Sequence, residues 1–236
     1  MNTSNKDSRD YANLQKNTVS ASCQLKDCDH IRFLNPDGKG KRILFAGNSI
    51  TLHGPKADIG WHGQWGMAAS EKEKDYVHLI ISETGKEAAD CVFCICQVAE
   101  WEIQFKNGKT VYPKFENARS FNADIIVMRF VENCPSEDFD KQVFKKETAD
   151  LLAYLNPSGK AEIILTTGFW RHPADSGIIE LAEEMDLPLV PLGDLGDRDD
   201  MKALGLFEHA GVANHPGDLG MKHIADRIFE VLKNYL

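Results

Sequence analysis

The sequence has no apolar run long enough to cross a membrane. No segment approaches the roughly 18 consecutive apolar residues that a bilayer-spanning helix needs. Residues 1–11 are polar and carry both signs of charge, so the apolar core of a signal peptide is missing there. These two absences predict a cytoplasmic protein without a membrane partner.

The sequence also has fewer basic than acidic residues. Lysine and arginine number 27 against 36 acidic residues, which gives a formal net charge of −9 at pH 7. A nucleic-acid-binding surface needs clustered basic side chains to neutralise phosphates, and the densest basic run, residues 39–42, is short and typical of a solvated loop. The composition therefore argues against nucleic acid as a partner and against a polyanionic substrate.

The six cysteines lack the spacing of a zinc site. Cys91, Cys94 and Cys96 lie in one apolar run, where Cys94 and Cys96 would share a face of a buried strand and behave as small hydrophobic residues. The only other close pair is Cys23 and Cys28, and a four-thiolate site needs tighter ligand spacing. We expect no metal and no cofactor.

What the sequence does contain is a regular alternation of apolar runs and amphipathic segments from residue 41 onward, after a polar lead-in over residues 1–40. The expected strands are 42–46, 91–98, 124–131, 161–166 and 187–192, and the expected helices are 70–85, 136–155, 176–185 and 218–236. Ser70 and Glu73 form a capping box at the start of the first helix, and Gly85 is expected to end it. This order predicts one α/β domain over residues 41–236, with a five-stranded parallel sheet covered by helices on both faces.

Ligands of such folds bind at the carboxyl ends of the strands, where Gly47-Asn48-Ser49-Ile50-Thr51 follows the first strand. Taken alone, these residue types are typical of a tight turn. Their position makes Ser49 a candidate nucleophile, although the Gly-x-Ser-x-Gly elbow of the α/β-hydrolases is absent.

Two further polar residues lie at the same predicted edge. His215 stands in the loop before the last helix, which Pro216 holds extended, and it is the candidate base that a serine nucleophile requires. Asn133 follows the third strand, and its side-chain amide can donate to a developing oxyanion. Each of them also has an ordinary structural interpretation, as a capping histidine and a turn asparagine.

Together, Gly-Asn-Ser-Ile-Thr, Glu-Asn-Cys-Pro and His-Pro resemble the motifs of the SGNH (GDSL-type) hydrolases, over residues 41–236. The resemblance implies a flavodoxin-like three-layer α/β/α sandwich and metal-free hydrolysis of carboxylic esters, often acetyl groups on carbohydrates. By position it makes Ser49 the nucleophile and one oxyanion donor through its N–H, Asn133 another donor, and His215 the general base. The implied partner is a small-molecule ester such as an acylated carbohydrate.

The chain departs from the family pattern at two places. A glycine commonly follows the second strand, and here the N–H of Ala99 would take its part in the oxyanion hole. An aspartate commonly stands three residues before the histidine, and here that residue is Val212. Either a backbone carbonyl orients the imidazole in a Ser–His dyad, or another carboxylate replaces the aspartate, the candidates being Glu208, Glu132 and Asp194.

Five residues near the predicted edge are candidates for substrate binding: Asn48, Trp61, Trp65, Arg129 and Trp170. Arg129 stands where the family commonly has a glycine, and it either binds substrate or braces the site through an ion pair with a neighbour such as Glu132. The tryptophans suit stacking on a sugar ring, and they equally suit a lid packed on the sheet edge.

Two other function classes remain open at this point. A non-catalytic ligand-binding protein of the same fold would leave Ser49 inert to an active-site label. A flavodoxin-type cofactor module would use the Gly47–Thr51 turn around a phosphate, and a colourless purified protein would argue against it.

Overall fold

The computed structural model describes residues 25–236, which form a six-stranded sheet in the order β1-β3-β2-β4-β5-β6. The strands are β1 (Ile31–Leu34), β2 (Arg42–Gly47), β3 (Val92–Gln97), β4 (Ile125–Arg129), β5 (Glu162–Thr166) and β6 (Leu189–Val190). Neighbours from β3 to β6 are parallel, and β1 is antiparallel to β3. The five parallel strands have the flavodoxin-like order, which confirms the predicted fold class.

The sheet has one strand more than predicted. β1 lies in the segment that was expected to be a polar lead-in, and it pairs Ile31 with Cys96 and Leu34 with Phe93. The sheet therefore begins before residue 41, and the predicted count of five strands was wrong by this edge strand. Residues 1–24 of the predicted lead-in, Cys23 included, lie outside the described residues.

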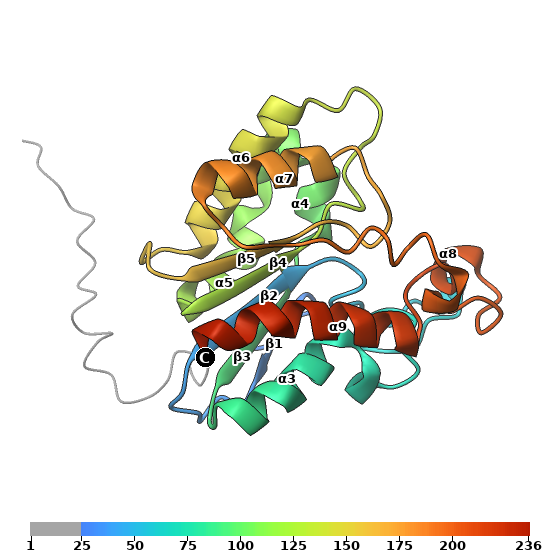
Figure 1. Cartoon of the computed structure of the whole chain (residues 1–236), viewed down its shortest axis with the longest axis horizontal. Coiled ribbons are helices and arrows are strands. Elements are labelled where there is room, and N and C mark those ends of the chain that lie inside the picture. The colour runs from blue at the N-terminus through green and yellow to red at the C-terminus, as the bar shows by residue number, and fades with distance from the viewer. Residues whose placement is uncertain (1–24) are drawn as a thin grey trace, which may run out of the picture.

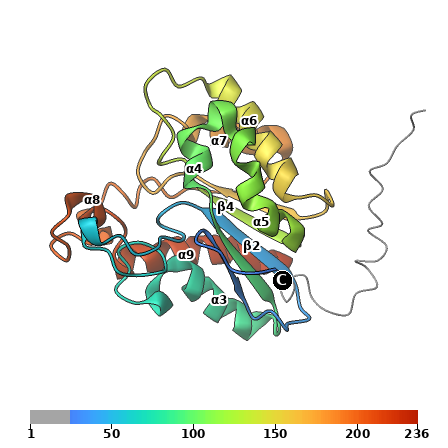
Figure 2. The ribbon, with the colours of Figure 1, turned by 180° about the vertical axis from the view of Figure 1, so that it is seen from behind.

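Helices cover both faces of the sheet (Figures 1 and 2). They are α3 (Tyr76–Glu87), α4 (Ala99–Ile103), α5 (Glu116–Phe121), α6 (Lys141–Leu155), α7 (Asp175–Met185), α8 (Ala210–Ala213) and α9 (Asp218–Leu232). α3 and α9 lie on one face, and α4 to α7 lie on the other (Figure 1). Each layer encloses its own apolar core.

The short helix α8 lies at one end of the sandwich, next to the loop that follows β2, in both views (Figures 1 and 2). A third apolar cluster joins them: Trp61 from the loop packs against Phe207, with ring centroids 6.1 Å apart, and Val212 of α8 is buried beside it. The loop after the predicted nucleophile is thus tied to the segment before the last helix.

The predicted capping box does not start the first helix. α3 begins at Tyr76, and the buried side chain of Asp75 caps it by accepting from the N–H of His78. Ser70 bonds to Asp218 instead, and Gly85 lies inside the helix. A cap of this kind is decided by tertiary contacts as well as by spacing, because both Ser70 and Asp75 are good N-cap residues.

The predicted helix over 136–155 also starts later, at Lys141, where Asp140 caps it by accepting from two backbone N–H groups. The last helix ends at Leu232 and is followed by a 3₁₀ turn, Lys233–Tyr235. The segment between β3 and β4, which the sequence left without elements, is helical: α4, a 3₁₀ stretch at Phe105–Phe115, and α5.

Within residues 25–236, no helix has both the length and the apolar content that crossing a bilayer requires.

Candidate active site

The three central strands deliver their following residues to one edge of the sheet. Gly47, the last residue of β2, is in register with Gln97 of β3 and with Arg129 of β4. Ser49 and Ala99 each lie two residues beyond this level. The structure therefore brings together the strand ends that the sequence singled out.

A tight turn follows β2 and carries Ser49. The carbonyl oxygen of Asn48 accepts from the N–H groups of Thr51 (2.9 Å) and Leu52 (3.0 Å). A Cβ atom on Gly47 would stand 2.0 Å from Thr51 Oγ1 and 2.4 Å from the carbonyl oxygen of Arg129, so only glycine fits there. The glycine lets the chain turn directly at the end of the strand, which lifts Ser49 to the sheet edge.

Ser49 and His215 are in hydrogen-bond contact, with Ser49 Oγ 2.8 Å from His215 Nε2. The other ring nitrogen, Nδ1, lies 2.7 Å from the carbonyl oxygen of Gly211. A carbonyl only accepts, so Nδ1 carries the hydrogen and Nε2 is left as the acceptor of the serine proton. This is the tautomer that a general base needs.

Of the alternatives that the sequence left open for orienting His215, the structure has the backbone carbonyl, that of Gly211. Glu132 pairs with Arg129, and Asp194 pairs with Arg227. Glu208 is exposed. Serine and histidine thus form a dyad in which a neutral dipole takes the place of the usual carboxylate.

The environment of His215 favours its neutral form. Burial lowers the pKa of His215 to about 4, the hydrogen bond to Gly211 opposes this, and the positive charges of Arg129, His53 and His209 lower it further. The ring also meets Trp170 edge to face, with centroids 5.3 Å apart. His215 is therefore an unprotonated base well into the acid range.

Two backbone N–H groups are free near the dyad. Among the described residues, the N–H of Ser49 and the N–H of Ala99, the first residue of α4, have no hydrogen-bond acceptor. Val98, which precedes Ala99, is bonded to β2 through its N–H, 2.6 Å from the carbonyl oxygen of Gly47. This bond fixes the start of α4 against the turn that carries Ser49.

The side chain of Asn133 is held by a carboxylate that the sequence analysis missed. Asn133 Nδ2 donates to Glu102 Oε2 at 2.7 Å, and Glu102 also accepts from Asn48 Nδ2 at 3.1 Å. Glu102 belongs to α4 and is completely buried. Burial raises its pKa, while hydrogen bonds from Asn133, Val131 and Asn48 and the charge of Arg129 counter the rise.

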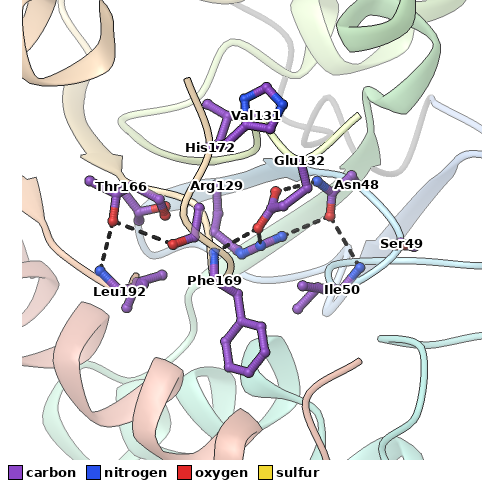
Figure 3. Close-up of polar contacts among 12 residues, drawn as sticks. Asn48, Ser49, Ile50, Arg129, Val131, Glu132, Thr166, Phe169, His172 and Leu192 are labelled. Carbon is purple, nitrogen blue, oxygen red and sulfur yellow. Dashed lines mark hydrogen bonds and ion pairs between the residues drawn. The ribbon is translucent and has the colours of Figure 1, made fainter. Parts of the chain in front are cut away.

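Arg129 braces this region from within the sheet. It is 0% exposed, donates to Asn48 Oδ1 at 2.7 Å and forms an ion pair with Glu132. Glu132 in turn accepts from Asn48 and from the N–H of Phe169, so the strand ends of β2, β4 and β5 share one network (Figure 3). Burial lowers the pKa of Arg129 to about 10. Of its two predicted roles, the structure has the ion pair that braces the site.

The predicted aromatic residues divide into two groups. Trp61 is 3% exposed and packs edge to face on Trp65, with ring centroids 5.6 Å apart, inside the third apolar cluster. Trp61 is thus part of the packed loop, and its faces are not open to a sugar ring. Trp65 and Trp170 are both partly exposed, and Trp170 lies against the catalytic candidate His215.

A cavity of about 690 Å³ lies on the β3 side of the sheet edge, and its lining includes neither Ser49 nor His215. It is lined by the loop after the nucleophile, including His53 and Gln64, by Gln97 and Glu100 beyond β3, and by residues of the β1 region such as Arg32. Most of the lining side chains are polar and carry both charges, and Pro55 and Phe115 are the apolar exceptions. No three His, Cys, Asp or Glu side chains converge as metal ligands would in the part of the chain that the structure describes.

Solved structures with the same fold include a lipase/acylhydrolase and two esterases. The lipase/acylhydrolase from Enterococcus faecalis aligns with 14% identity and a TM-score of 0.54, over 82% of this chain and 96% of that chain. A family two carbohydrate esterase from Clostridium thermocellum, in complex with cellohexaose, aligns with 16% identity and a TM-score of 0.55, over 83% of this chain and 65% of that chain. A two-domain esterase active on acetylated mannans, co-crystallised with mannopentaose, aligns with 17% identity and a TM-score of 0.55, over 82% of this chain and half of that chain.

The fold of this chain is that of the SGNH hydrolases. No protein-family model and no curated protein matches the sequence. At 14–17% identity the structural likeness concerns the fold alone. The chemistry of the SGNH-fold chain therefore has to be argued from its own residues.

Sequence reasoning missed two contributors to this site. Gly211 acts through its backbone, and a carbonyl oxygen is present at every residue, so no residue type could mark it. Glu102 had a weak signal: it is one of two glutamates that flank Trp101 just after the second strand, close to the expected oxyanion donor Ala99.

Proposed function

We propose that this chain is a serine esterase, which cleaves carboxylic esters through an acyl intermediate on Ser49. The observation that carries the proposal is the 2.8 Å contact between Ser49 Oγ and His215 Nε2, the ring nitrogen that the Gly211 contact leaves without a hydrogen. The free N–H groups of Ser49 and Ala99 and the anchored amide of Asn133 support it, because an ester carbonyl needs such donors as it becomes an oxyanion.

In the first half-reaction, Ser49 Oγ attacks the ester carbonyl carbon while its proton passes to His215 Nε2. The carbonyl oxygen takes the negative charge and accepts from the N–H groups of Ser49 and Ala99 and from Asn133 Nδ2. The tetrahedral intermediate then collapses: the bond to the alcohol breaks, and the alcohol leaves with the proton from Nε2.

In the second half-reaction, His215 takes a proton from water as the water attacks the acyl-serine carbonyl. Collapse of this intermediate releases the carboxylic acid and returns the proton to Ser49 Oγ. In both halves the imidazolium keeps its Nδ1–H bonded to the Gly211 carbonyl, which prevents the ring from turning.

The proposed substrate is a small ester with a polar alcohol part, such as an acetylated carbohydrate. The cavity on the β3 side supports this, because Glu100 directly follows Ala99 and the lining by His53, Gln64, Gln97 and Glu100 suits hydroxyl groups better than a long acyl chain. Two of the structural neighbours are esterases that were crystallised with oligosaccharides.

The test is hydrolysis of p-nitrophenyl acetate, with longer acyl esters alongside, by the wild type, Ser49→Ala and His215→Ala. A matched control exists, because Ser136 Oγ and His172 Nε2 are also in contact, at 3.0 Å. In that pair Nδ1 accepts from the N–H of Ala174, so Nε2 carries the hydrogen and cannot act as a base.

We expect both site variants to lose all measurable turnover, while Ser136→Ala and His172→Ala keep it. If the wild type is no faster than Ser49→Ala, and Ser49 stays unlabelled by a fluorophosphonate, the esterase proposal is wrong and the chain is a binding protein of this fold.

A further inference from the structure

The carboxylate of Glu102 occupies an unusual position for a charged group. The residue, the fourth of the short helix α4, is 0% exposed, and no cation among the described residues is bonded to its carboxylate. Removing a carboxylate from water costs several kcal/mol unless hydrogen bonds replace the water. The cost indicates that this carboxylate has a task beyond packing.

Within the described residues, the hydrogen bonds of the Glu102 carboxylate all lead to residues around the dyad. Oε1 accepts from the N–H of Val131 at 2.5 Å and from Asn48 Nδ2 at 3.1 Å, and Oε2 accepts from Asn133 Nδ2 at 2.7 Å. The N–H of Asn133 lies 3.5 Å from Oε1. Asn48 directly precedes Ser49, so one carboxylate touches both the nucleophile turn and the segment after β4.

The backbone at Val131 is strained, and Glu102 holds it. Val131 has φ of 119°, in the region that favours glycine, and a β-branched residue there is a rare outlier. Such a conformation costs about 1–3 kcal/mol and persists only where the surroundings fix it. It turns the chain at the end of β4, two residues before Asn133, and the Val131 N–H is bonded to Glu102.

The charge on Glu102 also fixes which way the Asn133 amide faces. An ionised carboxylate can only accept, so it selects the NH₂ end of the amide. One hydrogen of Nδ2 is used in this bond, and the second remains to donate to another acceptor. The orientation is therefore set by Glu102 and not by Asn133 itself.

We propose that Glu102 is a positioning residue: its carboxylate orients the Asn133 amide and the strained Val131 peptide, and so builds the oxyanion-binding side of the site. The inference rests on the proposed esterase function. Glu102 touches no substrate and moves no proton, and it acts through Asn133. α4 then supplies two parts of one site, the Ala99 N–H from its first residue and the support of Asn133 from its fourth.

The test is a double-mutant cycle of Glu102→Gln and Asn133→Ala, measured as kcat and KM on p-nitrophenyl acetate. In Glu102→Gln the amide oxygen can still serve Val131 and Asn48, but its NH₂ group faces Nδ2, donor against donor. We expect kcat to fall about tenfold to a hundredfold with little change in KM, because an oxyanion donor acts in the transition state. Asn133→Ala should lose about a hundredfold, and the double variant should lose no more than Asn133→Ala alone.

The matched control is Glu83→Gln on α3, outside the cavity lining, where the carboxylate is exposed and pairs with Lys86. It should keep the wild-type kcat. Multiplicative losses in the cycle, or a wild-type kcat in folded Glu102→Gln, would overturn the inference. If Glu102→Gln does not fold, Glu102→Asp replaces it in the cycle with the same two outcomes, since it withdraws the carboxylate by one methylene.

A second measurement separates this inference from the esterase proposal. The side-chain ¹⁵N amide signal of Asn133, assigned by its loss in Asn133→Ala, should show slow hydrogen exchange in the wild type and in Glu83→Gln, and fast exchange in Glu102→Gln. Equal exchange in all three proteins would refute the positioning role. This readout needs no turnover, so it stands even if Ser49→Ala shows that the chain is not an esterase.

Discussion

Acid pH is the perturbation that tests the dyad most directly, because the pKa of His215 lies at about 4. The active form of the base is the neutral imidazole. At pH 5.5 a pKa of about 4 leaves about 97% of His215 neutral, whereas the ordinary pKa of about 6.5 would leave about 9%. We therefore expect kcat/KM at pH 5.5 to be nearly that at pH 8, and to fall only near pH 4.

The assay is a pH–rate profile on p-nitrophenyl acetate, followed at the isosbestic wavelength of p-nitrophenol. Burial raises the pKa of Glu102, so the profile is repeated in Glu102→Gln, which removes that titration and should keep the acid limb of His215. A limb with its midpoint near 6.5 would refute the claim that burial lowers the pKa of the base.

The low pKa of His215 keeps the base active at acid pH, but it also makes the folded chain less stable there. The unfolded chain takes up a proton on His215 as the pH falls through about 6.5, and the folded chain does so only near pH 4. The free energy of unfolding therefore decreases as the pH falls from about 6.5 to about 4. The decrease is at most about 3 kcal/mol, and the partial exposure of His215 makes this value an upper limit. The difference in unfolding free energy between wild type and His215→Asn, from urea titrations, should change by this amount between pH 7 and pH 4. A constant difference would contradict the assignment.

Three substitutions test the local architecture by urea denaturation. Val212→Asp places an aspartate three residues before the histidine, but the side chain at this position is buried in an apolar cluster. We therefore expect no gain in activity and a decrease of more than about 2 kcal/mol in the free energy of unfolding, with a smaller decrease in Val212→Thr. A faster enzyme would refute this placement. Gly47→Ala should destabilise the chain by more than about 2 kcal/mol and lower turnover, because the added Cβ meets Thr51. The control Gly85→Ala, which has open space in α3, should stabilise the chain by about 0.5–1 kcal/mol. Equal effects of the two substitutions would contradict the geometry. Val131→Gly should be more stable than Val131→Ala by about 1 kcal/mol, the reverse of the usual order, because φ is positive there; the usual order would exclude the strain.

The central strands could be predicted because their residues are almost all apolar and are buried on both faces of the sheet. Ile43, Leu44, Phe45 and Ala46 are all 0% exposed, and a continuous apolar run of this length is typical of a parallel strand covered on both faces. β1 has only four residues and lies at the edge of the sheet, where it pairs with β3 alone. Its sequence therefore carries no comparable apolar run.

The helix starts show where local rules compete. Ser70 with Glu73 has the spacing of a capping box, and Asp75 is an equally good cap. The structure chooses Asp75 because its carboxylate also accepts from the N–H of Gly66, in the loop after the nucleophile, at 2.9 Å. This choice depends on a contact nine residues away, which the local pattern does not contain.

The side chains proposed to act in the candidate site could be predicted from the sequence, whereas the residue that holds Asn133 in place, Glu102, could not. Ser49, Asn133 and His215 have residue types whose chemistry points to a hydrolase, and their places at strand ends and before the last helix could be read from the order of elements. Glu102 could not be assigned in this way, because a glutamate on a short helix is most often solvated. Its role follows from burial, which only the fold decides.

The missing aspartate has a physical explanation in the turn of α8. His209 caps this helix by accepting from the N–H of Val212, and the N–H of His215 returns to the Val212 carbonyl at 2.9 Å. The tight turn directs the Val212 side chain into the apolar cluster and the Gly211 carbonyl toward the imidazole. A carbonyl dipole can fix the tautomer as well as a carboxylate can, but it stabilises the imidazolium less because it carries no full charge. The arrangement thus exchanges some stabilisation of the charged intermediate for a base that stays neutral in acid.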